Sequence, residues 1–224
     1  MDFEIPLRQG TTTGIKYKSL LEVARPATLV LAHGAGAGQR HPFMVSFARA
    51  LSERGVDVLT FNFLYMEQRR RMPDRMPQLV ECFEAAIAAA REQLPSARER
   101  LFIGGKSMGG RAATHVAASH SSIALGLVLL GYPLHPPGRQ DQLRDAHLPD
   151  VKLPMLFVQG SRDTFGPPAE LEPILARLSP RPELHAVEGG DHSFKISGKD
   201  ASKRQAAVSM EIQEHIARWI AGTP

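Results

Sequence analysis

The sequence predicts an α/β fold in which a doubly wound, mostly parallel β-sheet carries helices on both faces. Two observations and one general rule support this prediction. Short apolar runs rich in branched residues alternate along the chain with longer segments whose apolar residues recur at helical spacing. The run Ala27–Ala32 is apolar or β-branched throughout, as in strands that are buried on both faces of a parallel sheet. Strands that alternate with helices form parallel sheets with right-handed crossovers.

Length and composition are those of one domain that spans residues 1–224. The 224 residues include 43% hydrophobic ones, which is enough for a full core. The single cysteine, Cys82, excludes an internal disulfide and is expected to be a buried thiol. The acidic start of the chain has no apolar leader, and the apolar run Ile123–Leu130 is too short to cross a bilayer. We therefore expect a soluble, cytoplasmic protein with no membrane partner.

The charge distribution bears on possible partners. The net charge is +4, a small excess for this length, and basic residues concentrate in the block Arg69–Arg71 with Arg75 nearby. No basic stripe interleaved with aromatic residues accompanies this block, so we expect no nucleic-acid partner. Two interpretations of the block stay open: a solvated loop face, or a clamp for an anionic substrate.

Eight segments have the length and composition of strands. In chain order they are Asp2–Leu7, Gly14–Ser19, Ala27–Ala32, Val56–Phe61, Arg100–Ile103, Ala124–Leu130, Met155–Gln159 and Leu184–Val187, with a turn expected at Gly10–Gly14. Apolar residues at helical spacing predict helices at 43–51, 79–90, 111–118, 169–178 and 208–220. Two long segments without periodicity, Asn62–Pro77 and Tyr132–Leu153, are predicted to be loops, the second a cap or pocket wall.

One glycine-rich stretch carries a chemical motif. Gly104-Gly-Lys-Ser-Met-Gly-Gly110 contains the pattern G-x-S-x-G between a predicted strand and a predicted helix. In this context the pattern predicts a nucleophile elbow, a turn so sharp that Ser107 projects its side chain from a sparsely allowed backbone conformation. Gly105 and Gly109 flank the serine because a Cβ there would collide across the turn. The alternative is a plain glycine-rich turn, and only partners for the serine distinguish the two.

Two later strands are followed by residues that could activate the serine. In such folds functional residues follow the carboxyl ends of the strands. The strand Met155–Gln159 is followed by Asp163, and Leu184–Val187 by a glycine-rich loop that contains His192. A serine hydroxyl becomes a nucleophile when an imidazole accepts its proton and a carboxylate orients that imidazole. Ser107, His192 and Asp163 are therefore the candidate catalytic residues.

Other acidic residues are candidates for the orienting carboxylate. Asp141 and Asp145 follow the preceding strand and could supply it if the long loop folded inward. Asp191 is adjacent to His192 in the sequence and poorly placed to reach the imidazole ring, so a turn-forming role is expected. Asp163 is preferred because it comes shortly after the end of a predicted strand, whereas Asp141 and Asp145 lie within the long loop.

Acyl transfer also needs hydrogen-bond donors for a developing oxyanion. The backbone N–H of Met108, directly after the nucleophile, is one candidate. The second is expected in the loop His33–Gly36, from Ala35 or, as second choice, from Gly34. A phosphate-binding loop is the alternative, but no Walker lysine follows and the spacing does not match G-x-G-x-x-G. No cysteine pair and no H-E-x-x-H motif occurs, so neither a metal nor a cofactor is expected.

Four segments carry a resemblance to a known family. They are His33–Gly36, Gly104–Arg111, Gly131–Gly138 and Phe157–Asp163. With them, essentially the whole chain resembles a small α/β-hydrolase, and more narrowly the hydrolase-like proteins related to a non-catalytic subunit of the NSL histone acetyltransferase complex. The chain is also similar to the dienelactone hydrolases, which use a cysteine nucleophile where this chain has Ser107. The resemblance implies the α/β-hydrolase fold with little or no lid domain.

Two functions follow from these motifs. One is a serine esterase that cleaves a small-molecule ester or thioester through an acyl-enzyme at Ser107, with His192 as general base and acid and Asp163 orienting it. The other is a non-catalytic or weakly catalytic interaction protein on a hydrolase scaffold, because the resemblance includes interaction subunits. The complete set of catalytic candidates favours the esterase.

The expected substrate-binding residues come from the elbow and the two long loops. Lys106 lies inside the elbow, and Arg71 belongs to the basic block. A short apolar wall is expected from Tyr132, Pro133, Leu134 and Met108. A short wall with a modest excess of positive charge predicts short esters that bear a carboxylate or phosphate, whereas solvated arginines would leave no such preference. The sequence supports no expectation for the oligomeric state.

Overall fold

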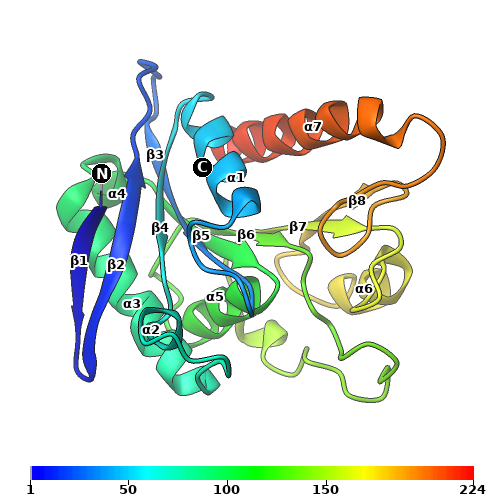
Figure 1. Ribbon diagram of the computed structural model, residues 1–224, viewed down its shortest axis with the longest axis horizontal. Helices are drawn as coiled ribbons and strands as arrows, with labels where there is room; N and C mark the ends of the chain where they lie inside the picture. Colours follow the sequence, from blue (N-terminus) through cyan, green and yellow to red (C-terminus); the bar gives the residue numbers. More distant parts are fainter. Residues whose placement is uncertain (1) are drawn as a thin grey trace.

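The computed structural model describes residues 2–224. This part of the chain forms an eight-stranded sheet between two layers of helices (Figure 1). The strands are β1 (Asp2–Leu7), β2 (Gly10–Tyr17), β3 (Ala27–Ala32), β4 (Val56–Phe61), β5 (Leu101–Lys106), β6 (Gly126–Leu130), β7 (Met155–Gly160) and β8 (Glu183–Val187). Their order across the sheet is β1-β2-β4-β3-β5-β6-β7-β8. β2 pairs antiparallel with β1 and β4, and the other neighbours are parallel. The predicted mostly parallel sheet is confirmed.

The helices divide between the two faces of the sheet, as the prediction required. α1 (Pro42–Ser52) and α7 (Ala201–Gly222) cover one face. The other face carries α2 (Leu64–Glu67), α3 (Met76–Gln93), α4 (Ser96–Glu99), α5 (Met108–Ser119) and α6 (Pro168–Leu175). In Figure 1, α1 and α7 lie above the sheet, whereas α3, α5 and α6 lie below it. Among residues 2–224, no helix is long and apolar enough to cross a membrane.

The central strands are buried on both faces, which explains their continuous apolar runs. Every residue of β3, β4, β5 and β7 is buried. Because side chains alternate along a strand, Leu29 and Leu31 belong to the core cluster under α1 and α7, whereas Val30 belongs to the cluster on the opposite face. The carboxyl ends of the parallel strands meet at one edge of the sheet, where the loops that follow them come together.

The first hairpin differs from its predicted form. β2 begins at Gly10, so the predicted turn Gly10–Gly14 belongs to this strand, and the turn lies at Arg8 and Gln9 instead. The threonines of the segment are β-branched and suit a strand. Their hydroxyls have partners there: the buried Thr12 hydroxyl donates to the Asn62 carbonyl at 2.6 Å. The polar composition that indicated a turn is therefore satisfied by contacts within the fold.

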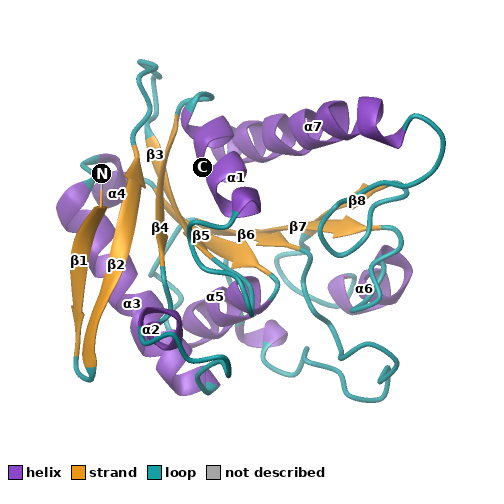
Figure 2. Cartoon of the chain, in the orientation of Figure 1, coloured by secondary structure: helices purple, strands orange, loops and turns teal. Residues whose placement is uncertain are grey.

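The segment predicted as the loop Asn62–Pro77 contains regular structure. α2 lies within it, and α3 begins at Met76, three residues before the first expected helical position. Pro77 does not interrupt α3 because it occupies the first turn, where its missing N–H would have no acceptor inside the helix. The second predicted loop, Tyr132–Leu153, carries the single turn η1 (Leu148–Asp150) and otherwise follows an irregular path below the sheet (Figure 2).

Candidate active site

Ser107 lies between β5 and α5, at the carboxyl edge of the sheet. Its backbone has φ 52° and ψ −116°, a conformation that residues with a side chain rarely adopt. Such strain persists where the surrounding structure determines the conformation, and it is concentrated at functional sites. The sharp turn expected from the G-x-S-x-G pattern is present.

Gly105 and Gly109 make this turn possible because neither position has room for a Cβ. A Cβ on Gly105 would lie 2.6 Å from the carbonyl oxygen of Ala32, and one on Gly109 would lie 2.5 Å from the same oxygen. The elbow and the end of β3 are therefore packed backbone against backbone. This contact fixes Ser107 relative to the loop that follows β3.

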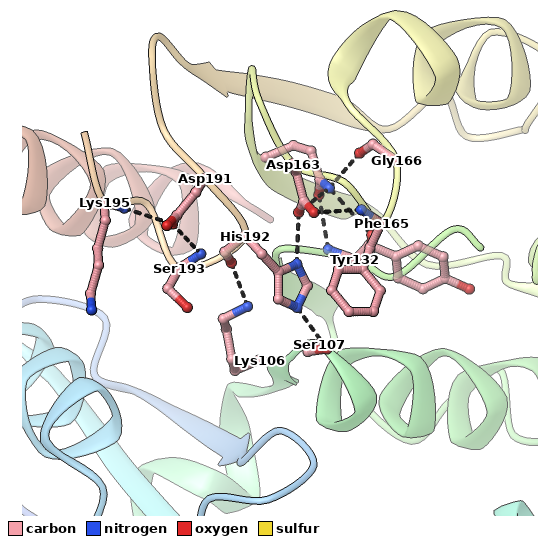
Figure 3. A network of polar contacts seen from close by, with 11 residues as sticks. Lys106, Ser107, Tyr132, Asp163, Phe165, Gly166, Asp191, His192, Ser193 and Lys195 are labelled. Atoms are coloured by element: carbon pink, nitrogen blue, oxygen red, sulfur yellow. Dashed lines mark hydrogen bonds and ion pairs between the residues drawn. The ribbon is translucent and has the colours of Figure 1, made fainter. Parts of the chain in front are cut away.

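His192 connects Ser107 to Asp163, as Figure 3 shows. The imidazole Nε2 lies 2.9 Å from Ser107 Oγ, and Nδ1 lies 2.8 Å from Asp163 Oδ2. Asp163 follows β7 and His192 follows β8, so the ends of β5, β7 and β8 bring the three residues together. The alternatives Asp141 and Asp145 lie in the loop after β6, and the carboxylate bonded to the imidazole belongs to Asp163.

The carboxylate of Asp163 is buried and held by two further hydrogen bonds. Its Oδ2 accepts from the Gln159 side-chain amide at 2.8 Å, and its Oδ1 accepts from the Phe165 N–H at 2.8 Å. Gln159 is fully buried, and its amide oxygen accepts from the Tyr132 N–H at 2.8 Å, which fixes the orientation of the amide. These donors hold the carboxylate in the orientation that faces His192.

Two neighbours hold His192 in place. The Phe165 ring lies against the imidazole, with the ring centroids 4.3 Å apart. The Lys106 ammonium donates to the His192 carbonyl at 2.6 Å. Burial lowers the pKa of Lys106 to about 8, an effect that the charges of Asp163 and Asp191 oppose. Lys106, expected to bind substrate, therefore lines the cavity while its ammonium positions the backbone of His192.

Asp191 forms the turn on which His192 is mounted. Its Oδ1 accepts from the N–H groups of Ser193 at 2.7 Å and of Lys195 at 3.0 Å (Figure 3). This is the turn-forming role expected from the sequence.

The two predicted oxyanion donors lie beside Ser107. Gly34, Ala35 and Met108 line the same cavity as the serine. A Cβ on Gly34 would lie 3.4 Å from the Ser107 Cβ, so the loop after β3 approaches the nucleophile closely. Met108 is the first residue of α5, and its N–H has no acceptor within the helix. The positive end of the α5 dipole lies at the same place.

His33 orients the peptide group that carries the Ala35 N–H. The buried imidazole donates from Nδ1 to the Gly34 carbonyl at 2.8 Å and accepts at Nε2 from the Phe63 N–H at 3.0 Å. Burial lowers the pKa of His33 to about 4, so the ring is neutral at pH 7. The Gly34 carbonyl and the Ala35 N–H belong to one planar trans peptide and point in opposite directions. The bond that holds the carbonyl therefore also aims the N–H.

A cavity of about 760 Å³ contains the Ser107 side chain, a size that suits a small-molecule ligand. Its lining includes His41, Phe43, Met44, Pro73, Asp74, Arg75, Met76, Leu79, Arg111, Pro133, Arg144, Phe165 and Ser193, besides the residues already described. The lining carboxylate, Asp74, is ion-paired with Arg70 at 2.5 Å. Among residues 2–224, no group of three or more histidine, cysteine or acidic side chains is arranged to hold a metal ion.

The apolar wall expected from Tyr132 and Leu134 differs from the wall observed. Both side chains are fully buried and lie outside the cavity lining, whereas Pro133 and Met108, the other two residues expected in this wall, line the cavity. The Tyr132 hydroxyl points away to donate to the Arg144 carbonyl at 2.7 Å. Arg71 is exposed and also lies outside the lining. Of the residues expected at the pocket, the structure places Lys106, Met108 and Pro133 in the cavity lining and Tyr132, Leu134 and Arg71 outside it.

Three residues of the site had no role assigned from the sequence. Gln159 carries a signal, because it is a polar residue at the end of an apolar strand. Arg111 carries another: it follows Ser107 by four residues on a helix, which places both on one face. His33 carries no local signal for its role, because its partner Phe63 follows a different strand.

Comparisons with solved structures agree with this fold. An α/β serine hydrolase homologue from Coxiella burnetii is 20% identical, with a TM-score of 0.75 over 97% of this chain and 96% of that chain. A serine hydrolase without a lid from Xanthomonas campestris is 22% identical, with a TM-score of 0.74 over 100% of this chain and 96% of that chain. A dienelactone hydrolase from Anabaena variabilis is 20% identical, with a TM-score of 0.72 over 96% of each chain.

A family model decides the classification. The model that describes the alpha/beta hydrolase domain matches residues 25–221, which is most of the chain. The elbow, the strand order and the match together place the sequence in one superfamily. The chain belongs to the alpha/beta hydrolase family.

Proposed function

We propose that the protein is a serine esterase that cleaves a small-molecule ester or thioester through an acyl-enzyme at Ser107. One observation carries the proposal: hydrogen bonds run from Ser107 through His192 to a buried Asp163, and Ser107 opens into a cavity of about 760 Å³. A nucleophile, a base, an orienting acid and nearby backbone donors are the parts that acyl transfer needs. The similarity to proteins described as serine hydrolases supports the reaction class by analogy.

Acylation begins when Ser107 Oγ attacks the carbonyl carbon of the ester and His192 Nε2 accepts the hydroxyl proton. The carbonyl oxygen becomes an oxyanion, which the N–H groups of Ala35 and Met108 stabilise. Asp163 stabilises the imidazolium and keeps the proton on Nδ1. The intermediate then collapses, the bond to the leaving oxygen or sulfur breaks, and Nε2 returns its proton to the leaving group.

Deacylation repeats these steps with water as the nucleophile. His192 Nε2 accepts a proton from water as its oxygen attacks the acyl carbon, and the same two N–H groups stabilise the second oxyanion. Collapse breaks the bond to Ser107 Oγ, which recovers its proton from Nε2. The products are a carboxylic acid and an alcohol or thiol, and the protein returns to its starting state.

Hydrolysis of a panel of 4-nitrophenyl esters with two to eight acyl carbons tests the proposal. We expect turnover by the wild-type protein and a loss to background in Ser107→Ala, because that substitution removes the attacking oxygen alone. Circular dichroism and thermal unfolding provide the control that Ser107→Ala is folded. Equal turnover in both proteins would overturn the assignment, and no turnover of any ester by the wild type would favour the interaction protein on a hydrolase scaffold.

A further inference from the structure

Positive charge is unevenly distributed within the cavity. Its lining includes Lys106, Arg75, Arg111 and Arg144, whereas its carboxylate, Asp74, is already paired with Arg70. The ammonium of Lys106 donates to the His192 carbonyl, and Arg75 is exposed to solvent. Arg111 and Arg144 are the two lining cations that are partly buried and that the machinery around Ser107 does not use.

The guanidinium of Arg111 lacks a protein partner. Its Nε is buried and has no hydrogen-bond partner among the residues that the structure describes. Within the same range, the arginine ion pairs are those of Arg8, Arg40, Arg54 and Arg70. A charged donor without a partner is costly to bury and calls for a compensating ion, water or ligand. Arg111 also lines the cavity, and none of its side-chain nitrogens has a hydrogen-bond partner among residues 2–224, so the guanidinium can accept a ligand from the cavity side. Arg111 lies one helical turn after Ser107, which puts this donor close to the reacting centre.

Arg144 lines the same cavity as Arg111, and its backbone is held there by the buried residues Tyr132 and Leu134. The Arg144 N–H donates to the Leu134 carbonyl at 2.8 Å, and the Arg144 carbonyl accepts from the Tyr132 hydroxyl at 2.7 Å. These bonds fix the Arg144 backbone on the wall of the cavity. Burial and then the positive charge of Arg111 lower the pKa of Arg144, so the two guanidinium groups repel each other. An anion placed between them would relieve that repulsion.

We propose that Arg111 and Arg144 form a carboxylate-binding subsite, so that the preferred substrates are short esters that carry a carboxylate. Two guanidinium groups offer parallel N–H donors that match a planar carboxylate, and such charge-assisted bonds are strong. The inference rests on the proposed esterase function and names its substrate class. The carboxylate belongs to either the acyl or the alcohol part of the ester, and the subsite chemistry is the same for both.

Two matched substrate pairs test the subsite in the wild-type protein. The first compares the mono-4-nitrophenyl ester of glutaric acid with 4-nitrophenyl valerate, which places the charge in the acyl part. The second compares 4-acetoxybenzoate with 4-acetoxybenzamide, which places it in the leaving group. After subtraction of uncatalysed hydrolysis, kcat/KM is expected to be about 10- to 100-fold higher for the charged member of one pair at low salt. Salt should reduce this preference.

Three variants separate the subsite from general electrostatics. Arg111→Gln and Arg144→Gln should each remove most of the preference while changing kcat/KM for the neutral ester by less than about threefold. Arg139→Gln removes the same charge from an exposed position on the same loop as Arg144, and should keep the preference. Calorimetric binding of glutarate, which does not require turnover, should weaken at least about tenfold in Arg144→Gln.

The outcomes distinguish this inference from the proposed function. Hydrolysis of neutral esters with no preference in either pair would overturn the subsite and leave the esterase intact. A preference that survives Arg111→Gln and Arg144→Gln would also overturn it. If no ester is hydrolysed, the proposed esterase function is wrong. The subsite is then judged by calorimetry alone, and equal affinity of the wild type and Arg144→Gln for glutarate would reject it. If Arg111→Gln does not fold, Arg144→Gln carries the test alone.

Discussion

On one side of the cavity, the elbow and the loops after β3, β7 and β8 meet through buried hydrogen bonds and backbone contacts. On the other side, segments 62–75 and 131–154 contribute arginine side chains, and apart from α2 and η1 their backbone is irregular. On the first side, buried side chains hold the groups around the serine through hydrogen bonds: Gln159 holds Asp163, and His33 holds the Gly34 carbonyl. The second side also holds its backbone through hydrogen bonds, and it lines the cavity with the side chains of Arg75 and Arg144, whereas its Arg70 and Asp74 are paired with each other. Under the proposed function, the first side performs the chemistry, and the second side contributes to substrate selection together with Arg111 of α5.

The largest expected effect comes from the orienting acid. Asp163→Asn should lower kcat by about 10⁴, as it does in a well-studied triad of another protein, because the amide favours the wrong imidazole tautomer. Steady-state kinetics on the best neutral ester measures the change, with thermal unfolding as the check on folding. Asp141→Asn, in the exposed loop of the opposite side, is the matched control and should leave kcat within about twofold. A large loss in Asp141→Asn instead would move the acid to the other side of the cavity.

The first side of the cavity could be predicted from the sequence because its determinants are local. Glycines at 105 and 109 are needed for the turn around Ser107, and the order of Ser107, Asp163 and His192 follows the ends of successive strands. The periodicity of apolar residues likewise predicts the helices that cover the two faces of the sheet.

The second side could not be predicted in the same way. Which residue of Tyr132-Pro133-Leu134 faces the cavity depends on the path of an irregular backbone, and that path is determined by distant partners such as Gln159. Long arginine side chains add to the difficulty, because sequence position alone does not place Arg71 outside the cavity and Arg144 inside it. The first hairpin was predicted with its turn misplaced, and α2 was not predicted, for a related reason: polar residues there are satisfied by tertiary contacts.

A smaller effect is expected from the residue that aims the Ala35 N–H. His33→Phe should lower kcat about 10- to 100-fold with little change in KM, because complete loss of one oxyanion donor costs about 10² to 10³ in kcat. His33→Asn can place an amide donor near the Gly34 carbonyl and should recover part of the rate. A purely structural role would instead lower kcat and stability together in both variants, with no recovery by asparagine.

His33 should also make the stability depend on pH. Its pKa is about 4 in the folded protein and about 6.5 in an unfolded chain, so below pH 6.5 the unfolded state binds the proton first. This contribution is complete above pH 6.5 and is lost as the pH falls toward 4. Between pH 6.5 and 5 it removes about 2 kcal/mol from the free energy of unfolding. Urea unfolding at both pH values measures this: the decrease in the free energy of unfolding should be smaller in His33→Phe than in the wild type by that amount. Equal decreases in the two proteins would contradict a buried neutral imidazole at His33.

The smallest expected effect belongs to the exposed arginine block. Arg71→Gln should change kcat/KM for neutral and carboxylated esters by less than about twofold, because Arg71 lies outside the cavity lining and is exposed. Kinetics at low salt is the most sensitive measurement, since screening is weakest there. A decrease in kcat/KM for the carboxylated ester alone would show that Arg71 contributes to substrate binding.

The most direct test of the account is labelling with a small fluorophosphonate, followed by mass spectrometry of the modified peptide. The probe reacts with a serine that an adjacent imidazole activates, and it depends on no knowledge of the substrate. The account predicts one adduct per chain, on Ser107, that disappears in Ser107→Ala and forms much more slowly in His192→Ala and Asp163→Asn. An unlabelled wild-type protein, or an adduct that persists in Ser107→Ala, would contradict the claim that Ser107 is an activated nucleophile.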